Sequence, residues 1–209
     1  MFDVSFSPDG QILASGGDKI IKLWKPDGTL IKTLRGHTSS VFSVHFSPDG
    51  RILASSEDKT IKLWKLDGTL IKTLRGHTGS VFSVRFSPDG QLIASDSDDN
   101  TIKLWKPDGT LIKTLRGHTD IRTFFGFGTD SVSFSPDGQT LATSSSDYTV
   151  KLWKPDGTML KILRGHTGPV WSISFSPDGQ ILASGSSDGT VKLWKLDGAL
   201  IKMLNRPLG

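Results

Sequence analysis

The chain has no cysteine among its 209 residues, and it contains one tyrosine and three methionines. The lack of cysteine excludes disulfide bonds, thiol nucleophiles and cysteine metal sites. No apolar run approaches the roughly 20 residues that a membrane-spanning helix needs. The N-terminal sequence MFDVSFSPDG has neither the basic start nor the apolar stretch of a secretion signal. We therefore expect a cytoplasmic protein with an ordinary hydrophobic core.

What the chain does contain is a repeat of about 40 residues. The motif FSPDG occurs five times, with its phenylalanine at positions 40, 40, 48 and 41 residues apart: Phe6, Phe46, Phe86, Phe134 and Phe175. The motif KLWK also occurs five times, with its tryptophan at Trp24, Trp64, Trp105, Trp153 and Trp194. This period is typical of four-stranded propeller blades, and the helical periodicity of solenoid repeats is absent.

Each unit divides into four short strands separated by turn signals. In the second copy, residues 41–46 alternate and end at Ser-Pro-Asp-Gly, residues 52–56 and 60–65 follow, and Leu-Asp-Gly leads into residues 69–74. A single sheet of this kind cannot bury both faces, so the copies must stack radially. The prediction is an all-β propeller with five four-stranded antiparallel blades in one domain, residues 1–209. The blades are expected at about 1–35, 41–75, 81–116, 129–164 and 170–205, with an insertion at about 120–128.

Gly-His pairs precede four of the tryptophans, at 36–37, 76–77, 117–118 and 165–166. With the Trp-containing motif, they resemble the WD40-repeat β-propeller family, in particular its highly repetitive, recently amplified bacterial members. The dipeptide reads Trp-Lys in every copy, so the family's surface Asp is absent. The resemblance implies buried hydrogen-bonded tetrads at His37, Ser55, Asp58 and Trp64; His77, Ser95, Asp99 and Trp105; His118, Thr143, Asp147 and Trp153; and His166, Ser184, Asp188 and Trp194.

The recurrence of Ser or Thr, His and Asp in four equivalent places favours a structural network over a catalytic triad, since a nucleophile needs a singular open pocket. The resemblance therefore implies a non-catalytic scaffold that binds protein or peptide at the top-face entrance of the central channel. Function is expected where the copies differ, at the start of the innermost strand and before the turn Asp. The predicted partner-binding residues at these places are Phe2, Phe42, Phe82, Asp130, Trp171, Glu57 and Asp98. The aromatic rings are either binding anchors or structural residues that plug a narrow channel or pack between neighbouring blades.

The insertion carries three further predicted partner-binding residues, Phe124, Phe125 and Phe127. They form an exposed contact patch on a loop between blades or a packing element, or the insertion is a remnant of imperfect repeat amplification or a local sequence anomaly. The acidic residues Glu57 and Asp98 near the entrance favour a basic or amide-rich peptide.

No cofactor or metal is expected. Asp96, Asp98 and Asn100 imitate the start of a calcium loop, but Thr101 replaces its glycine. Nucleic acid is disfavoured as a partner despite a net charge of +4. The repeated lysines are spread evenly and are expected to ring the outer strands: Lys22, Lys62, Lys103, Lys151 and Lys192.

Five blades are fewer than the seven usual in the resembled family. Two arrangements follow: a tight five-bladed ring, or a homodimer in which exposed terminal blades of two chains share a larger propeller ring. In the second arrangement the protein, natural or designed, is a self-assembling repeat that needs no ligand. The last repeat ends in LNRPLG where the others read LRGHT, so Pro207 stands at the histidine position.

Overall fold

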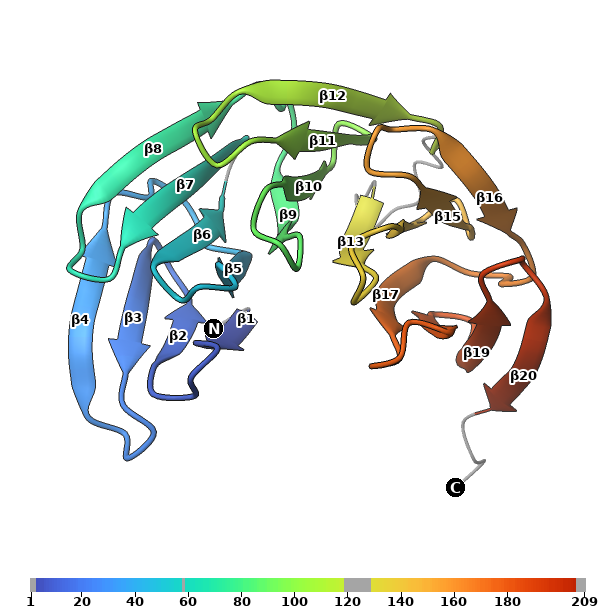
Figure 1. Ribbon diagram of the computed structural model, residues 1–209, viewed down its shortest axis with the longest axis horizontal. Helices are drawn as coiled ribbons and strands as arrows, with labels where there is room; N and C mark the ends of the chain where they lie inside the picture. Colours follow the sequence, from blue (N-terminus) through green and yellow to red (C-terminus); the bar gives the residue numbers. More distant parts are fainter. Residues whose placement is uncertain (1–2, 58, 119–128, 206–209) are drawn as a thin grey trace.

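The computed structural model describes residues 3–57, 59–118 and 129–205 of the chain. These residues form five separate sheets, each of four antiparallel strands in chain order. The strands follow one another radially from the centre of the molecule to its rim (Figure 1). The prediction of an all-β fold built from five four-stranded blades is confirmed. No helix in the described ranges has the length and hydropathy needed to cross a bilayer.

The blades are numbered 1 to 5 along the chain, and equivalent strands have similar bounds. The innermost strands are β1 (Asp3–Phe6), β5 (Ser43–Phe46), β9 (Val81–Phe86), β13 (Thr129–Phe134) and β17 (Val170–Phe175). The second strands are β2 (Leu13–Gly16), β6 (Ile52–Ser56), β10 (Ile93–Ser97), β14 (Leu141–Ser145) and β18 (Ile181–Ser186). The third strands are β3 (Ile20–Trp24), β7 (Thr60–Lys65), β11 (Thr101–Trp105), β15 (Val150–Trp153) and β19 (Thr190–Lys195). The outermost strands are β4 (Leu30–Arg35), β8 (Leu70–Arg75), β12 (Leu111–Arg116), β16 (Met159–Leu163) and β20 (Leu200–Asn205).

The repeated Ser-Pro-Asp-Gly turn joins the first and second strands through side-chain hydrogen bonds. In blade 2, Ser47 Oγ donates to Asp49 Oδ1 at 2.6 Å and accepts from the backbone N–H of Ile52 at 2.9 Å. Gly50 closes the turn with φ +71°, a conformation that favours glycine. The Ser47 hydroxyl and the Arg51 N–H hold the pKa of the Asp49 carboxyl below its ordinary value. The turn chemistry therefore accounts for the near-verbatim FSPDG motif.

Neighbouring blades pack through two different faces. The leading face of a blade looks toward the preceding blade, and the trailing face looks toward the following one. The trailing face of blade 1 and the leading face of blade 2 form one core cluster. Its trailing-face members are Ala14, Ile21, Leu23 and Leu34, and its leading-face members are Val41, Val44, Phe46, Leu53 and Trp64. Equivalent clusters join the remaining blades in sequence. Because successive residues of a strand point to opposite faces, one repeat sequence supplies both surfaces.

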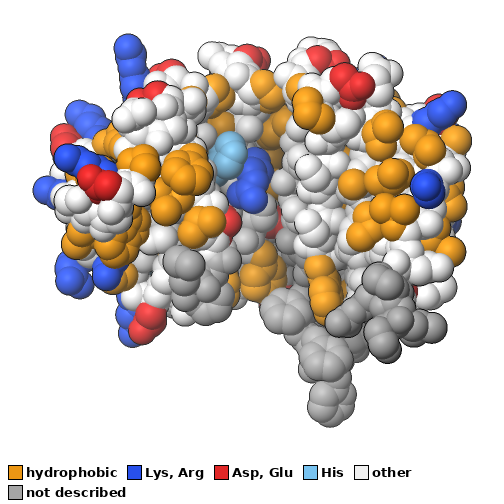
Figure 2. Space-filling model, turned by 90° about the horizontal axis from the view of Figure 1, so that it is seen from below, with side chains coloured by type: hydrophobic (Ala, Val, Ile, Leu, Met, Phe, Trp, Pro, Cys, Tyr) orange, Lys and Arg blue, Asp and Glu red, His pale blue; other side chains and the backbone are white. Residues whose placement is uncertain are grey.

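The five blades form an open arc, with blade 1 and blade 5 at its two ends (Figure 1). The leading face of blade 1 is uncovered: Phe6 is 60% exposed, whereas Phe46 in the equivalent position is 3% exposed. The trailing face of blade 5 is also uncovered: Leu204 is 42% exposed, whereas the equivalent Leu34 is 1% exposed. Figure 2 views the molecule from the open side and shows hydrophobic side chains on both sides of the hollow. The tight five-bladed ring is therefore not formed.

Candidate functional site

The structure brings the predicted tetrad residues of blades 3, 4 and 5 together. In blade 3, His77 Nδ1 lies 2.9 Å from Asp99 Oδ2, and its Nε2 lies 2.8 Å from Ser95 Oγ. The indole N–H of Trp105 donates to the same hydroxyl at 2.9 Å. The equivalent contacts, between 2.8 and 3.0 Å, join His118, Asp147, Thr143 and Trp153 in blade 4, and His166, Asp188, Ser184 and Trp194 in blade 5. In blade 1 the described residues supply the indole bond alone, from Trp24 to Ser15 at 2.9 Å.

The tetrad has the hydrogen-bond directions of a catalytic triad, but burial separates its serine from any substrate. The carboxylate of Asp99 accepts the Nδ1 proton of His77, so Nε2 is the acceptor and Ser95 donates its hydroxyl proton to it. The same hydroxyl oxygen accepts from the buried indole of Trp105. Ser95 is completely buried, so a substrate cannot approach its oxygen. The arrangement satisfies every polar group of the network and stabilises the blade interface.

Blade 2 departs from the predicted tetrad, because Glu57 occupies the place of the carboxylate. Glu57 Oε2 contacts His37 Nδ1, and Oε1 accepts from the backbone N–H groups of Thr38 and Ser39, both at 2.6 Å. The prediction that Glu57 faces a partner at the channel entrance is therefore wrong, since this residue is 1% exposed. Blade 2 has one residue fewer than blade 3 between the tetrad serine and the turn Asp, so the longer side chain reaches the histidine. Asp58, the predicted member, lies outside the described residues.

The tetrad aspartates of blades 3, 4 and 5 remain charged inside the fold. Burial alone raises the pKa of the Asp99 carboxyl, but hydrogen bonds from His77, Thr101 and Thr78 outweigh it and hold the pKa well below its ordinary value. The same balance lowers the pKa of Asp147 and Asp188. Burial is also the main cause of the lowered pKa of His118.

The repeated lysines of the third strands do not ring the outside of the molecule, and that prediction is wrong. The four in blades 2 to 5 are buried: Lys62, Lys103, Lys151 and Lys192. The Lys103 ammonium donates to Thr114 Oγ1 at 2.9 Å, and the Lys151 ammonium pairs with Asp147 at 3.0 Å. Burial lowers the pKa of both amines. These four lysines therefore offer no surface to a phosphate backbone.

The aromatic residues predicted at the channel entrance lie where the innermost strands begin. Phe42 and Phe82 form an edge-to-face pair with ring centroids 5.3 Å apart, and both are half-buried. Trp171, in the equivalent position of β17, is 54% exposed. Asp98 is exposed before the turn that follows β10. Phe2 and the insertion residues Phe124, Phe125 and Phe127 lie outside the described residues, and Asp130 is described only as part of β13.

Deeper in the channel, polar side chains of neighbouring innermost strands meet in a cluster that the sequence reasoning missed. Arg85 Nη1 donates to Ser43 Oγ at 2.9 Å and lies 3.8 Å from Asp3 Oδ2. Ser43 Oγ in turn donates to Asp3 Oδ2 at 2.9 Å. His45 and Arg85 also line a cavity of about 380 Å³. Figure 2 shows a histidine beside a basic side chain in the hollow of the arc.

The signal for this cluster was present in the sequence. The position before the FSPDG phenylalanine is occupied by serine in three copies and by His45 and Arg85 in the other two: the serines are Ser5, Ser133 and Ser174. Position 3 likewise has aspartate where the other copies have serine. These exchanges place charged and titratable groups on the channel wall, where the repeats differ in sequence.

His45 is kept neutral by its position in the channel. Burial, with a smaller contribution from the Arg85 charge, lowers the pKa of His45 from 6.5 to about 3. The Phe86 backbone N–H donates to its Nδ1 at 3.3 Å, which requires an unprotonated nitrogen. Below about pH 6.5 the unfolded chain protonates His45, whereas the folded protein keeps it neutral until the pH approaches 3.

We expect His45→Ser, which installs the residue of the other copies, to reduce the acid sensitivity of the fold. A histidine with a lowered folded pKa contributes its full stability above pH 6.5 and loses it as the pH falls toward 3. The wild type should lose up to about 1.4 kcal/mol more than the variant for each pH unit in this window. Urea unfolding at a series of pH values measures the difference. Parallel pH profiles for the two proteins would contradict this assignment.

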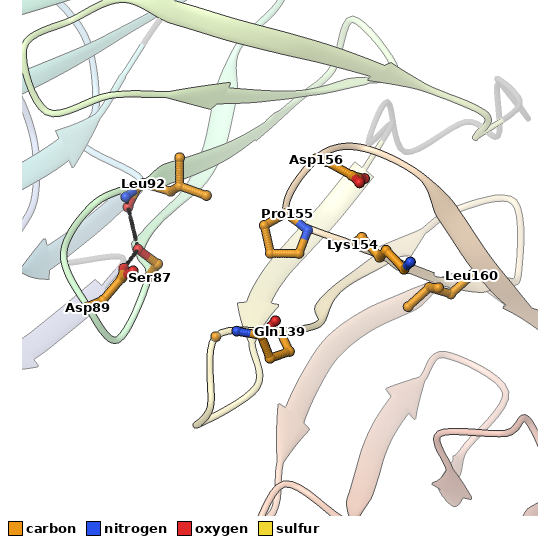
Figure 3. Close-up of a pocket in the computed structure, with 9 residues that line it drawn as sticks. Ser87, Asp89, Leu92, Gln139, Lys154, Pro155, Asp156 and Leu160 are labelled. Atoms are coloured by element: carbon orange, nitrogen blue, oxygen red, sulfur yellow. Dashed lines mark hydrogen bonds between the residues drawn. The ribbon is translucent and has the colours of Figure 1, made fainter.

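Grooves also recur at the opposite end of the channel, between the turns of adjacent blades. One of about 540 Å³ lies between blades 3 and 4, and Figure 3 shows Ser87, Asp89, Gln139 and Lys154 among its lining residues. A groove of about 450 Å³ lies at the equivalent place between blades 2 and 3. Their repetition shows that they arise from blade packing. Within the described part of the chain, no three His, Asp or Glu side chains lie close enough to hold a metal ion.

The family model described as WD domain, G-beta repeat matches the chain five times, at residues 1–25, 28–65, 68–106, 109–154 and 157–195. These matches cover most of the sequence, and each match after the first begins at the outermost strand of one sheet and ends with the third strand of the next. The chain therefore belongs to the WD40-repeat family and is a propeller scaffold of the kind that typically mediates protein interactions. A search of curated proteins found no match to the chain.

Proposed function

We propose that the protein is a non-catalytic scaffold that binds a peptide segment of another protein at the channel entrance, where the innermost strands begin. The observation that carries the proposal is the aromatic group at this entrance. Phe42 and Phe82 pack edge to face, and Trp171 presents more than half of its surface. Large rings held on rigid strands make strong anchors, because they bury much area and lose little conformational freedom.

The arrangement favours a binding anchor over a plug. The blades form an open arc, so the channel is not enclosed on all sides (Figure 1). Buried valines precede the aromatic positions and hold the strands in place: Val41, Val81 and Val170. The polar group of Asp3, Ser43 and Arg85 lies further along the same strands, so apolar and charged contacts follow one another down the channel.

The charge at the entrance sets a preference for the peptide. Glu57 is buried and cannot contact a peptide. Asp98 is exposed at the entrance, and its negative charge favours a basic segment. A peptide with an apolar or aromatic residue next to a lysine or arginine fits this combination.

The test uses peptides selected from a display library on the wild-type protein. We expect the triple variant Phe42→Ala, Phe82→Ala and Trp171→Ala to weaken their binding by about 30-fold or more, the effect of losing interface anchors. Fluorescence anisotropy measures the Kd, and circular dichroism verifies the fold.

A control removes three exposed apolar residues from the outermost strands of middle blades: Leu70→Ala, Leu111→Ala and Met159→Ala. This control should leave the Kd unchanged. Selected peptides that bind the entrance variant as tightly as the wild type would refute the proposal.

A further inference from the structure

We propose that the two ends of the arc bind each other between copies of this chain. The leading face of blade 1 in one molecule packs on the trailing face of blade 5 in the next. The inference is independent of the proposed peptide site, because it concerns the ends of the arc rather than the channel entrance.

The two uncovered faces are chemically complementary, since the molecule already joins the same two surfaces at each internal interface. The uncovered trailing face of blade 5 carries Ala183, Val191, Leu193 and Leu204, which correspond to Ala14, Ile21, Leu23 and Leu34 in blade 1. The uncovered leading face of blade 1 carries Val4, Phe6, Leu13 and Trp24, which correspond to Val44, Phe46, Leu53 and Trp64 in blade 2. A second copy therefore supplies an apolar surface of the matching composition for each face, and the angle at this junction differs from the internal one so that the two arcs do not overlap.

The exposure at the ends is specific to these faces. Val4 and Val191 are exposed, whereas Val44 and Val150 in equivalent positions are 1% exposed. The first apolar residue of each outermost strand, by contrast, is exposed in all five blades and belongs to the ordinary rim: Leu30, Leu70, Leu111, Met159 and Leu200. Contiguous apolar surface confined to two complementary faces is the mark of an interface.

A cavity at the leading face shows where the second copy would fit less well than an internal neighbour. Ser15, Asp18 and Trp24 line a cavity of about 290 Å³. In blade 3 the equivalent Ser95 hydroxyl bonds both the Trp105 indole and the imidazole of His77. His77 comes from the end of the preceding repeat. The last repeat has Pro207 in that position, so a junction between two copies lacks the tetrad. The association is therefore weaker than an internal interface and depends on concentration.

The pairing is head-to-tail, because a leading face meets a trailing face rather than its own kind. Each added molecule leaves one face of each type uncovered until the assembly closes. We expect the mass to rise with concentration from 22.7 kDa, because the molecules associate through a heterologous interface.

Sedimentation velocity on four proteins tests the inference: the wild type, Phe6→Asp, Leu204→Asp, and Leu70→Asp as the control with similar exposure on the rim. The wild type and Leu70→Asp should associate alike. Each end variant alone should associate at least about 100-fold more weakly, because the interface would bury an unpaired carboxylate. Phe6, Leu204 and Leu70 are 60%, 42% and 44% exposed, so none of the substitutions disturbs the core.

Mixing the two end variants gives the decisive result. Phe6→Asp retains the trailing face of blade 5, and Leu204→Asp retains the leading face of blade 1, so the mixture should form a dimer that grows no further. A mixture that stays monomeric would overturn the head-to-tail pairing. A wild-type mass of one chain at every concentration would overturn the inference altogether.

A second variant strengthens the junction instead of breaking it. Arg206→Gly with Pro207→His recreates the Gly-His pair of the internal repeats, and the histidine can join Ser15 and Trp24 of the next copy. Association should tighten by about tenfold, the effect of one or two added hydrogen bonds to a buried site. No tightening would contradict the predicted register of the two faces.

Discussion

Trp105→Ala is expected to lower the free energy of unfolding by about 3–5 kcal/mol, whereas Trp24→Ala costs about 1–2 kcal/mol. Both indoles donate to a serine hydroxyl at 2.9 Å. Trp105 is 1% exposed in the interface between blades 2 and 3, whereas Trp24 lies on the uncovered leading face of blade 1. The comparison separates the packing of the ring from its hydrogen bond, because the bond is common to both positions.

Urea unfolding followed by far-ultraviolet circular dichroism measures both variants, at a concentration where each sediments as one chain. The repeat provides its own control, since the same substitution is made in two nearly identical sequences. Equal losses at the two positions would show that the local sequence, rather than the neighbouring blade, sets the contribution of the indole.

Asp99→Ala is expected to cost about 3 kcal/mol or more, because it removes one acceptor that serves four donors. Asp99 Oδ2 accepts from His77 Nδ1 and Thr78 N at 2.9 Å, and Oδ1 accepts from Thr101 N and Oγ1 at 3.0 and 2.5 Å. The substitution also leaves His77 buried without its carboxylate. Asp18→Ala is the matched control in blade 1, where the carboxylate is exposed, and should change the stability by less than about 0.5 kcal/mol.

The pH dependence provides a second measurement on Asp99. Its hydrogen bonds hold the folded pKa below the value of about 3.9 in the unfolded chain, so the stabilisation is complete above that value and is lost as the pH falls. The difference between wild type and Asp99→Ala should therefore narrow below about pH 4. A constant difference across this range would show that Asp99 acts by its shape rather than by its charge.

The blade architecture was predictable because every copy repeats the same strand and turn signals. The prediction for Glu57 is wrong because the distance from Asp to Trp is constant in the repeats, which points to Asp58, while the distance from Ser to Asp is shorter in blade 2. The prediction for the third-strand lysines is wrong for a different reason. In β7, Ile61 and Leu63 face blade 3, so Lys62 shares the side of Trp64, and its stem is buried along the blade.

Closure of the ring was not predictable from the repeats. Each repeat determines the two faces of its blade, and neighbouring blades cover these faces in the same way in a ring of any size or in an open array. The channel cluster of Asp3, Ser43 and Arg85 has a signal in the sequence, the exchanges at positions 3 and 85, but the contacts themselves depend on how the innermost strands lie side by side. Such contacts come from the arc as a whole rather than from one repeat.

The open arc also determines how stability is distributed along the chain. Within the described residues, each inner blade packs on two neighbours and each end blade on one. A closed propeller has as many interfaces as blades, whereas a linear array has one fewer, so its statistics are those of a one-dimensional nearest-neighbour lattice. In such a lattice the terminal units open first and most often, and cooperativity decreases from the centre outward. Blade 3, at the middle of the array, is the thermodynamic centre of the molecule.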